Sequence, residues 1–98
     1  MDKLHTPQVD ELFEAILSLE NPEECYRFFE DVCTVKEIMD IAQRLKTAKM
    51  LSRGANYQEI YKETGCSTAT ISRVRRCLEY GAGGYQTVLA RASEKENQ

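Results

Sequence analysis

One spacing of glycine and apolar residues, in the second half of the chain, constrains the fold more than any other feature. If Tyr57 is the first position of a short helix, Gly65 stands at the ninth position. Ile71 and Val74 then stand at the fifteenth and eighteenth positions. Glycine adopts the tight turn needed at the ninth position, and the two apolar side chains can anchor a second helix on the core. The pattern predicts a helix-turn-helix, although Tyr61 stands where a small residue is usual.

The outward face of the second helix carries side chains suited to DNA. When Ile71, Val74 and Leu78 point inward, hydroxyl, methyl and guanidinium groups point outward at about 100° per residue. Short hydroxyl and methyl groups suit base edges, and arginines suit guanine or phosphate. The alternative is a solvated surface helix in a plain helical bundle. The predicted DNA-binding residues here are Ser67, Thr68, Ala69, Thr70, Ser72, Arg75 and Arg76, the two arginines serving mainly as phosphate contacts.

Helix signals extend along the whole chain, and no apolar–polar alternation typical of a strand persists. Start signals at Thr6-Pro7 and Asn21-Pro22, and a capping box at Thr34 and Glu37, precede apolar residues at helical spacing. We therefore expect an all-α fold of five to six helices. The expected helices cover residues 8–19, 22–32, about 35 to the glycine at 54, 57–64, 68–80 and 85–92, with a polar tail from about 93.

Charge is divided unevenly along the 98 residues, a length that predicts one domain. Residues 1–33 hold two basic and nine acidic side chains, whereas residues 34–80 hold nine basic and five acidic ones. The second part can therefore present a basic face, although the whole chain has a net charge of −3. No stretch approaches the roughly 20 apolar residues of a membrane span, and the N-terminus lacks the order of a signal peptide. We expect a cytoplasmic protein without membrane contact.

Nothing in the chain predicts catalysis, a cofactor or a metal site. The four cysteines form no Cys-x-x-Cys pair, which favours buried free thiols. His5 is the sole histidine and stands near a terminus, so neither a metal cluster nor a nucleophile–base pair can form around it. The segment 81–85 is rich in glycine but follows a helix and lacks a P-loop lysine, which indicates a hinge. Glu59 and Glu63 are better explained as a solvated face than as an acid–base pair.

The first two helices carry more apolar surface than one short helical chain can easily cover. The apolar residues of the second helix do not fall on one narrow stripe, which predicts packing partners on two sides of that helix. The stripe Ile38, Ile41, Ala42, Leu45 and Ala48 should add core surface on the third helix. We expect an obligate homodimer. The apolar residues in question on the first two helices are Phe13, Ile16, Leu17, Tyr26, Phe28, Phe29 and Val32.

Residues 34–78 resemble the Trp repressor family. The likeness rests on the capping-box helix with Arg44, on Gly54, Gln58 and Gly65, and most sharply on the run Ala69-Thr70-Ile71-Ser72-Arg73. The acidic and aromatic stretch 23–31 resembles the narrower YerC/YecD type. The resemblance implies one domain over residues 1–98, in which helices within about 8–52 intertwine two chains and residues 57–80 bind double-stranded DNA. It adds Gln58 to the predicted DNA-binding residues.

The resemblance also implies an effector site, but two positions of this sequence differ from the pocket of the tryptophan repressor. Two arginines of the tryptophan repressor flank the indole ring of the corepressor, and Arg44 and Arg73 stand at the matching positions. A glycine of that pocket is Val74 here, and a hydroxyl residue is Cys77. Because an isopropyl group would fill the space of the ring, we do not expect tryptophan as corepressor. The two arginines could bind another small anion or serve as structural or phosphate contacts.

Two functions of different classes remain. The leading hypothesis is a dimeric, sequence-specific DNA-binding transcriptional regulator that acts as a repressor. The alternative is a dimeric helical module that binds another protein without specific DNA binding, its arginines contacting an acidic surface.

Overall fold

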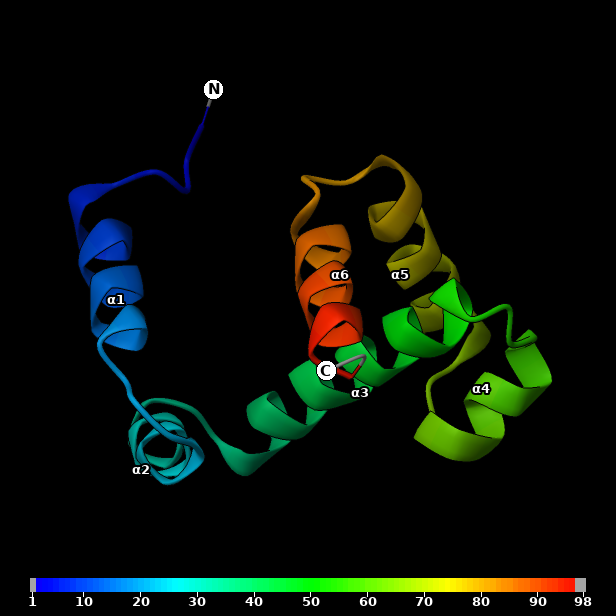
Figure 1. Cartoon of the computed structure of the whole chain (residues 1–98), viewed down its shortest axis with the longest axis horizontal. Helices are drawn as coiled ribbons and strands as arrows, with labels where there is room; N and C mark the ends of the chain where they lie inside the picture. Colours follow the sequence, from blue (N-terminus) through cyan, green and yellow to red (C-terminus); the bar gives the residue numbers. More distant parts are fainter. Residues whose placement is uncertain (1, 97–98) are drawn as a thin grey trace. The chain divides into compact units, whose positions relative to one another are not determined.

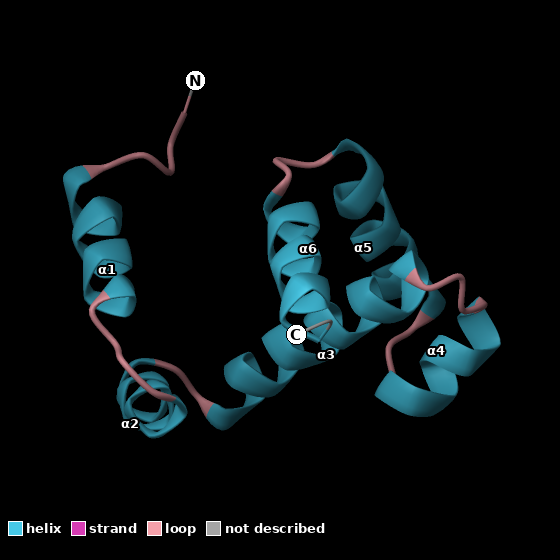
Figure 2. Cartoon of the chain, viewed as in Figure 1, coloured by secondary structure: helices cyan, strands magenta, loops and turns pink. Residues whose placement is uncertain are grey.

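The computed structural model describes residues 2–96, which form six helices and no strand (Figures 1 and 2). The predicted all-α fold is therefore confirmed. No helix in this part of the chain is long and apolar enough to span a bilayer. The helices are α1 (Pro7–Leu17), α2 (Pro22–Val32), α3 (Val35–Ser52), α4 (Tyr57–Thr64), α5 (Thr68–Tyr80) and α6 (Gly84–Glu96).

Side-chain caps explain where these helices begin. Thr6 and Asn21 accept hydrogen bonds from backbone N–H groups in the first turns of α1 and α2, at 3.2 and 2.9 Å. Thr34 and Glu37 form the predicted reciprocal box at α3, with distances of 2.8 and 3.1 Å. The hydrogen bonds from the backbone and side chain of Thr34 also lower the pKa of Glu37. Because each cap depends on residues three apart, the sequence alone could place these helix starts.

The chain divides into two compact units that meet within α3, between Ile38 and Met39. The N-terminal unit contains α1, α2 and the first turn of α3, and neither α1 nor α2 has a buried residue. An apolar hollow of about 410 Å³ lies in this unit, and the rings of Phe28 and Phe29 pack edge to face at 5.4 Å. The hollow is lined by Pro22, Cys25, Tyr26, Phe29 and Ile38.

The expected core stripe of α3 is largely exposed. Ala48 is fully buried, but Ile41 and Leu45 keep 54% and 43% of their surface exposed, and Ala42 is also exposed. Most of the predicted core stripe is therefore not buried within one chain, and its place in the core of a dimer stays a prediction. Helical spacing shows which residues share a face, but it does not show what covers that face.

The C-terminal unit has a small core built around the turn between α4 and α5. Ile60, Cys66 and Ile71 form its centre, and the partly buried residues packed against them come from α3, the following loop and α4. Of the four free cysteines only Cys66 is buried; Cys33 is half-buried, and Cys25 and Cys77 are exposed. The prediction of buried thiols was therefore wrong for these last two, which lie on helix faces that the single chain does not cover.

The last helix is longer than expected. The predicted tail from about 93 is helical to Glu96, whose carboxylate lies 3.5 Å from Lys49 Nζ and 3.2 Å from Arg53 Nη2. Residues 97–98 lie outside the described part of the chain. These ion pairs join α6 to α3 across more than 40 residues. The sequence of the polar tail alone therefore could not predict them.

Gly65 has a φ of +76° at the end of α4. Replacing it by alanine should lower the free energy of unfolding by about 1 kcal/mol, because a Cβ disfavours this left-handed conformation. Space is not the cause, since no heavy atom lies within 4 Å of the added Cβ. Gly84→Ala, equally unobstructed but without positive φ at the start of α6, is the control and should be neutral or slightly stabilising in urea denaturation. Equal destabilisation by both variants would contradict the conformational explanation.

Candidate nucleic-acid interface

The structure forms the predicted helix-turn-helix from α4, a turn at residues 65–67, and α5 (Figure 1). Gly65 takes the left-handed conformation that ends α4, and Ser67 caps α5 by accepting a hydrogen bond from Thr70 N at 3.2 Å. Ile71 is fully buried and Val74 is 3% exposed, as the spacing predicted. Tyr61 is 63% exposed, so its bulk does not enter the contact between the two helices.

The outward face of α5 is open to solvent. The hydroxyl of Thr70 lies 3.1 Å from Ser67 Oγ, and Thr70 is half-buried rather than exposed as expected. Thr70 is less exposed than expected because the hydrogen bonds of the cap hold its side chain against Ser67 at the start of α5. The other predicted DNA-binding residues are exposed, namely Gln58, Ser67, Thr68, Ala69, Ser72, Arg75 and Arg76.

The two candidate phosphate-binding arginines differ in their surroundings. Arg75 Nε lies 3.1 Å from Glu79 Oε1, one helical turn away, and the hydrogen bond and charge of Glu79 raise the pKa of Arg75. No ion pair is recorded for Arg76 among residues 2–96. Arg76 is therefore more available to an outside anion than Arg75.

Tyr57 joins this face, and the sequence prediction missed it. Its hydroxyl lies 3.4 Å from Ser72 Oγ, and hydrogen bonds with Ser72 and Arg75 lower the pKa of the phenol. Tyr57 lies on α4, whereas Ser72 and Arg75 lie on α5, so no spacing within one helix could have predicted these interactions. The capping box of Asn56 and Glu59, which fixes the start of α4, was also missed, although its local spacing is a readable signal.

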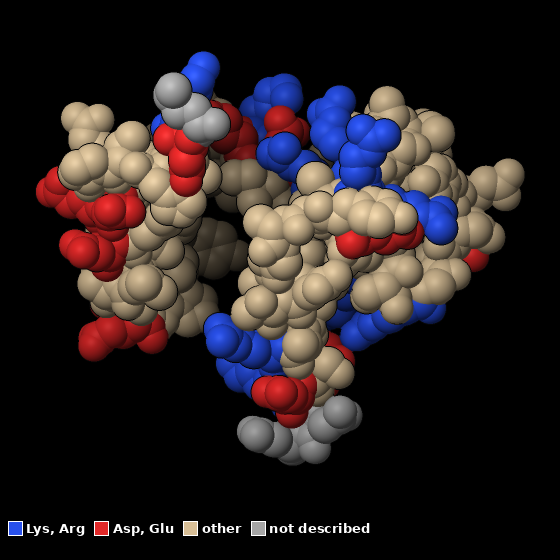
Figure 3. Space-filling view, turned by 90° about the horizontal axis from the view of Figure 1, so that it is seen from above, with Lys and Arg blue, Asp and Glu red and all other residues tan. Residues whose placement is uncertain are grey.

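Charge is distributed as the sequence indicated. In Figure 3 acidic side chains gather on the N-terminal unit, and lysines and arginines predominate on the visible face of the C-terminal unit. The latter unit includes the basic part of the chain, with nine basic and five acidic side chains over residues 34–80. A local positive field of this kind attracts a polyanion despite the net negative charge.

Arg44 and Arg73 are not joined by any recorded hydrogen bond or ion pair within the described residues. Arg44 Nε donates to the backbone carbonyl of Asp40 at 3.3 Å, whereas Arg73 is exposed on α5. Tyr85 of α6 is half-buried: burial raises the pKa of its phenol, and the charge of Arg44 opposes that effect. The charge of one of the two predicted effector residues therefore acts on an aromatic side chain of the chain itself.

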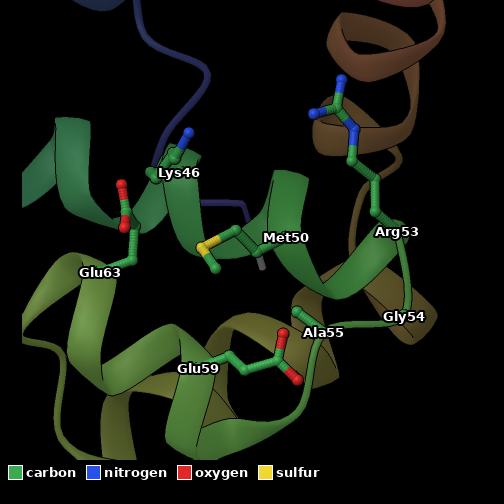
Figure 4. Close-up of a pocket in the computed structure, with 7 residues that line it drawn as sticks. All are labelled: Lys46, Met50, Arg53, Gly54, Ala55, Glu59 and Glu63. Carbon is green, nitrogen blue, oxygen red and sulfur yellow. The ribbon is translucent and has the colours of Figure 1, made fainter.

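A second hollow of about 380 Å³ lies between α3 and α4 (Figure 4). Two basic and two acidic side chains surround it, so it has no single sign of charge that would select an anion or a cation. No group of three or more potential metal ligands occurs within residues 2–96. The lining residues are Lys46, Met50, Arg53, Gly54, Ala55, Glu59 and Glu63.

Comparison with known proteins decides the family. The sequence profile of the family described as Trp repressor protein matches residues 7–93, nearly the whole chain. The chain belongs to the Trp repressor family. This is a regulatory family rather than an enzymatic one, and the resemblance found in residues 34–78 is confirmed.

Relatives of this Trp repressor family member are similar to it over nearly the whole chain. The uncharacterized protein YerC of Bacillus subtilis is 54% identical over 98 residues, which are 100% of this chain and 94% of that protein. A crystal structure of a TrpR-like protein from Eubacterium eligens has a TM-score of 0.91 at 53% identity, covering 93% of this chain and 94% of the other. A crystal structure of a Trp repressor candidate from Staphylococcus aureus gives a TM-score of 0.89 at 54% identity, covering 93% and 91%.

Proposed function

We propose that the protein is a dimeric, sequence-specific DNA-binding transcriptional regulator that acts as a repressor in the cytoplasm. The observation that carries the proposal is the division of α5 into two faces. Ile71 and Val74 are buried, whereas the opposite face exposes short hydroxyl and methyl groups together with arginines. A helix held in this way can enter the major groove with its first turns towards the base edges. Membership of a regulatory family supports the same conclusion.

Two copies of the chain complete the proposed binding unit. The exposed apolar faces of α1, α2 and α3 need a cover, and a second copy of the same chain offers an equally apolar face. The helices within about 8–52 would then dimerise the protein, while residues 57–80 of each chain bind one half-site.

Selection of bound sites from a random pool of duplexes tests the proposed function. A dimer with two-fold symmetry should enrich a pseudo-palindrome whose half-sites are about one helical turn, or a multiple of it, apart. A pool that shows no enriched sequence after repeated selection would contradict sequence-specific binding.

The exposed apolar surface of the N-terminal unit also supports the second candidate, a helical module that binds another protein. That function predicts little binding to any duplex at low salt, because the arginines would then serve an acidic protein surface. DNA binding by phosphate neutralisation instead has a steep salt dependence. Titration of random duplex at low salt separates the two candidates.

We propose that DNA binding does not require tryptophan. Val74 is 3% exposed, and an overfilled site typically costs about 1–3 kcal/mol, or roughly one to two decades of affinity. Calorimetry with free tryptophan should give no micromolar binding to the unmodified protein, and Val74→Gly should bind tryptophan more tightly if its melting temperature shows that it still folds. Micromolar binding to the unmodified protein, together with tighter DNA binding, would contradict this prediction. Binding of another small anion at Arg44 and Arg73 would not contradict this prediction.

A further inference from the structure

Tyr57 connects the two helices of the helix-turn-helix through both ends of its side chain. Tyr57 is the first residue of α4, and it packs against the core formed by Ile60, Cys66 and Ile71. Its hydroxyl lies 3.4 Å from Ser72 Oγ on the outward face of α5. The ring is held by packing, and a tyrosine has few rotatable bonds, so the phenol is preorganised at the surface.

Arg75 reaches the same phenol. It lies one turn after Ser72 on α5, it acts with Ser72 to lower the pKa of the Tyr57 phenol, and its Nε lies 3.1 Å from Glu79 Oε1. Ser72, Tyr57, Arg75 and Glu79 thus form one connected polar group, which we call the Tyr57 network. Two of its four members, Ser72 and Arg75, are predicted DNA-binding residues.

The donors and acceptors available in the Tyr57 network restrict the directions that its hydrogen bonds can take. A guanidinium has only donors, so Arg75 can act on the phenol oxygen only as a donor. The phenol then has its own single O–H to donate, and Ser72 Oγ is its neighbour. Either hydroxyl can be the donor in this contact; in the orientation where the phenol donates, Ser72 accepts and keeps its own O–H for an outside acceptor.

We propose that Tyr57 is a specificity-determining residue of the DNA interface, which orients Ser72 on the reading helix as a hydrogen-bond donor. The proposal rests on the proposed function and deepens it. A donor at this position matches the acceptors of the major groove, which are N7 and O6 of guanine, N7 of adenine and O4 of thymine. The amino group of cytosine is itself a donor, so Ser72 disfavours cytosine where it meets a base edge.

The test compares Tyr57→Phe with the unmodified protein on selected duplexes in which every base pair is varied in turn. Loss of the phenol hydroxyl should weaken the preference at one base-pair position about fivefold, the size of one ordinary hydrogen bond. Affinity for random duplex and the salt slope should stay unchanged, because the substitution removes no charge. Tyr61→Phe is the matched control, since this tyrosine of the same helix is 63% exposed and should have no effect.

A double-mutant cycle separates this role from a merely structural one. Ser72→Ala should lose the preference at the same base-pair position, and adding Tyr57→Phe to it should cause no further loss. Additive losses, a uniform loss over all sequences, or an unchanged preference in Tyr57→Phe would each overturn the proposal. Melting temperatures of the variants establish that they fold. Failure of the unmodified protein to prefer any sequence would contradict the proposed function, and this proposal with it, before a variant is measured.

Discussion

Replacing Ile41 by aspartate is expected to convert a folded dimer into monomers that no longer unfold cooperatively. Ile41 is 54% exposed in the single chain, between Met39 at 53% and Leu45 at 43% on α3. If a second copy covers this face, the substitution buries an unpaired carboxylate in each half of the interface. Breaking a buried pair to leave one uncompensated charge costs about 3–5 kcal/mol, a large fraction of the stability of a small domain.

Sedimentation equilibrium and thermal denaturation at several protein concentrations measure this effect. The unmodified protein should sediment as a dimer, and its melting temperature should rise with concentration because association stabilises the folded chain. Tyr61→Asp introduces the same charge at a side chain that is 63% exposed on α4, and it should remain dimeric. A well-folded monomer of the unmodified protein at micromolar concentration would contradict the proposed dimer.

Arg76→Ala is expected to weaken binding to all duplexes alike, by about tenfold or more for two symmetric contacts near physiological salt. Arg76 is exposed and, among residues 2–96, has no recorded ion pair. Its guanidinium is therefore available to a phosphate, and losing it should reduce the salt slope by about one unit per protomer. Arg75→Ala should have a smaller effect, because Arg75 is already paired with Glu79.

Substitutions at the front of α5 should act differently from Arg76→Ala. Exchanging Ala69 or Thr70 should change which sequence is preferred, since these residues stand in the first turn of the reading helix. Binding competition between selected and altered duplexes distinguishes a changed preference from a uniform loss. If Thr68, Ala69 and Thr70 could all be exchanged without altering the preference, α5 would not face the major groove.

Local interactions explain why so much of the fold could be predicted from the sequence. Caps at Thr6, Asn21 and Thr34 depend on neighbours three residues away, and the turn at Gly65 depends on one backbone conformation. Periodicity then identified Ile71 as a core anchor. The fold class and the buried face of α5 were accessible because each follows from short stretches of chain.

Long-range interactions explain what the sequence could not supply. The contact of Tyr57 with Ser72 joins residues 15 apart, and the ion pairs of Glu96 join residues more than 40 apart. Spacing within one helix contains no information on either. The exposed stripe around Ile41 is a different case, because its pattern was read correctly as apolar, but periodicity within one helix does not show what covers that face.

Titration of the selected duplex and of a scrambled duplex with the unmodified protein, over a range of salt concentrations, tests sequence-specific binding most directly. We expect both affinities to fall steeply with salt, since phosphate contacts release counterions. The selected duplex should bind about a thousandfold or more tighter than the scrambled one at physiological salt, as specific regulators do. Equal affinities for the two duplexes, or no binding to either at low salt, would contradict the account.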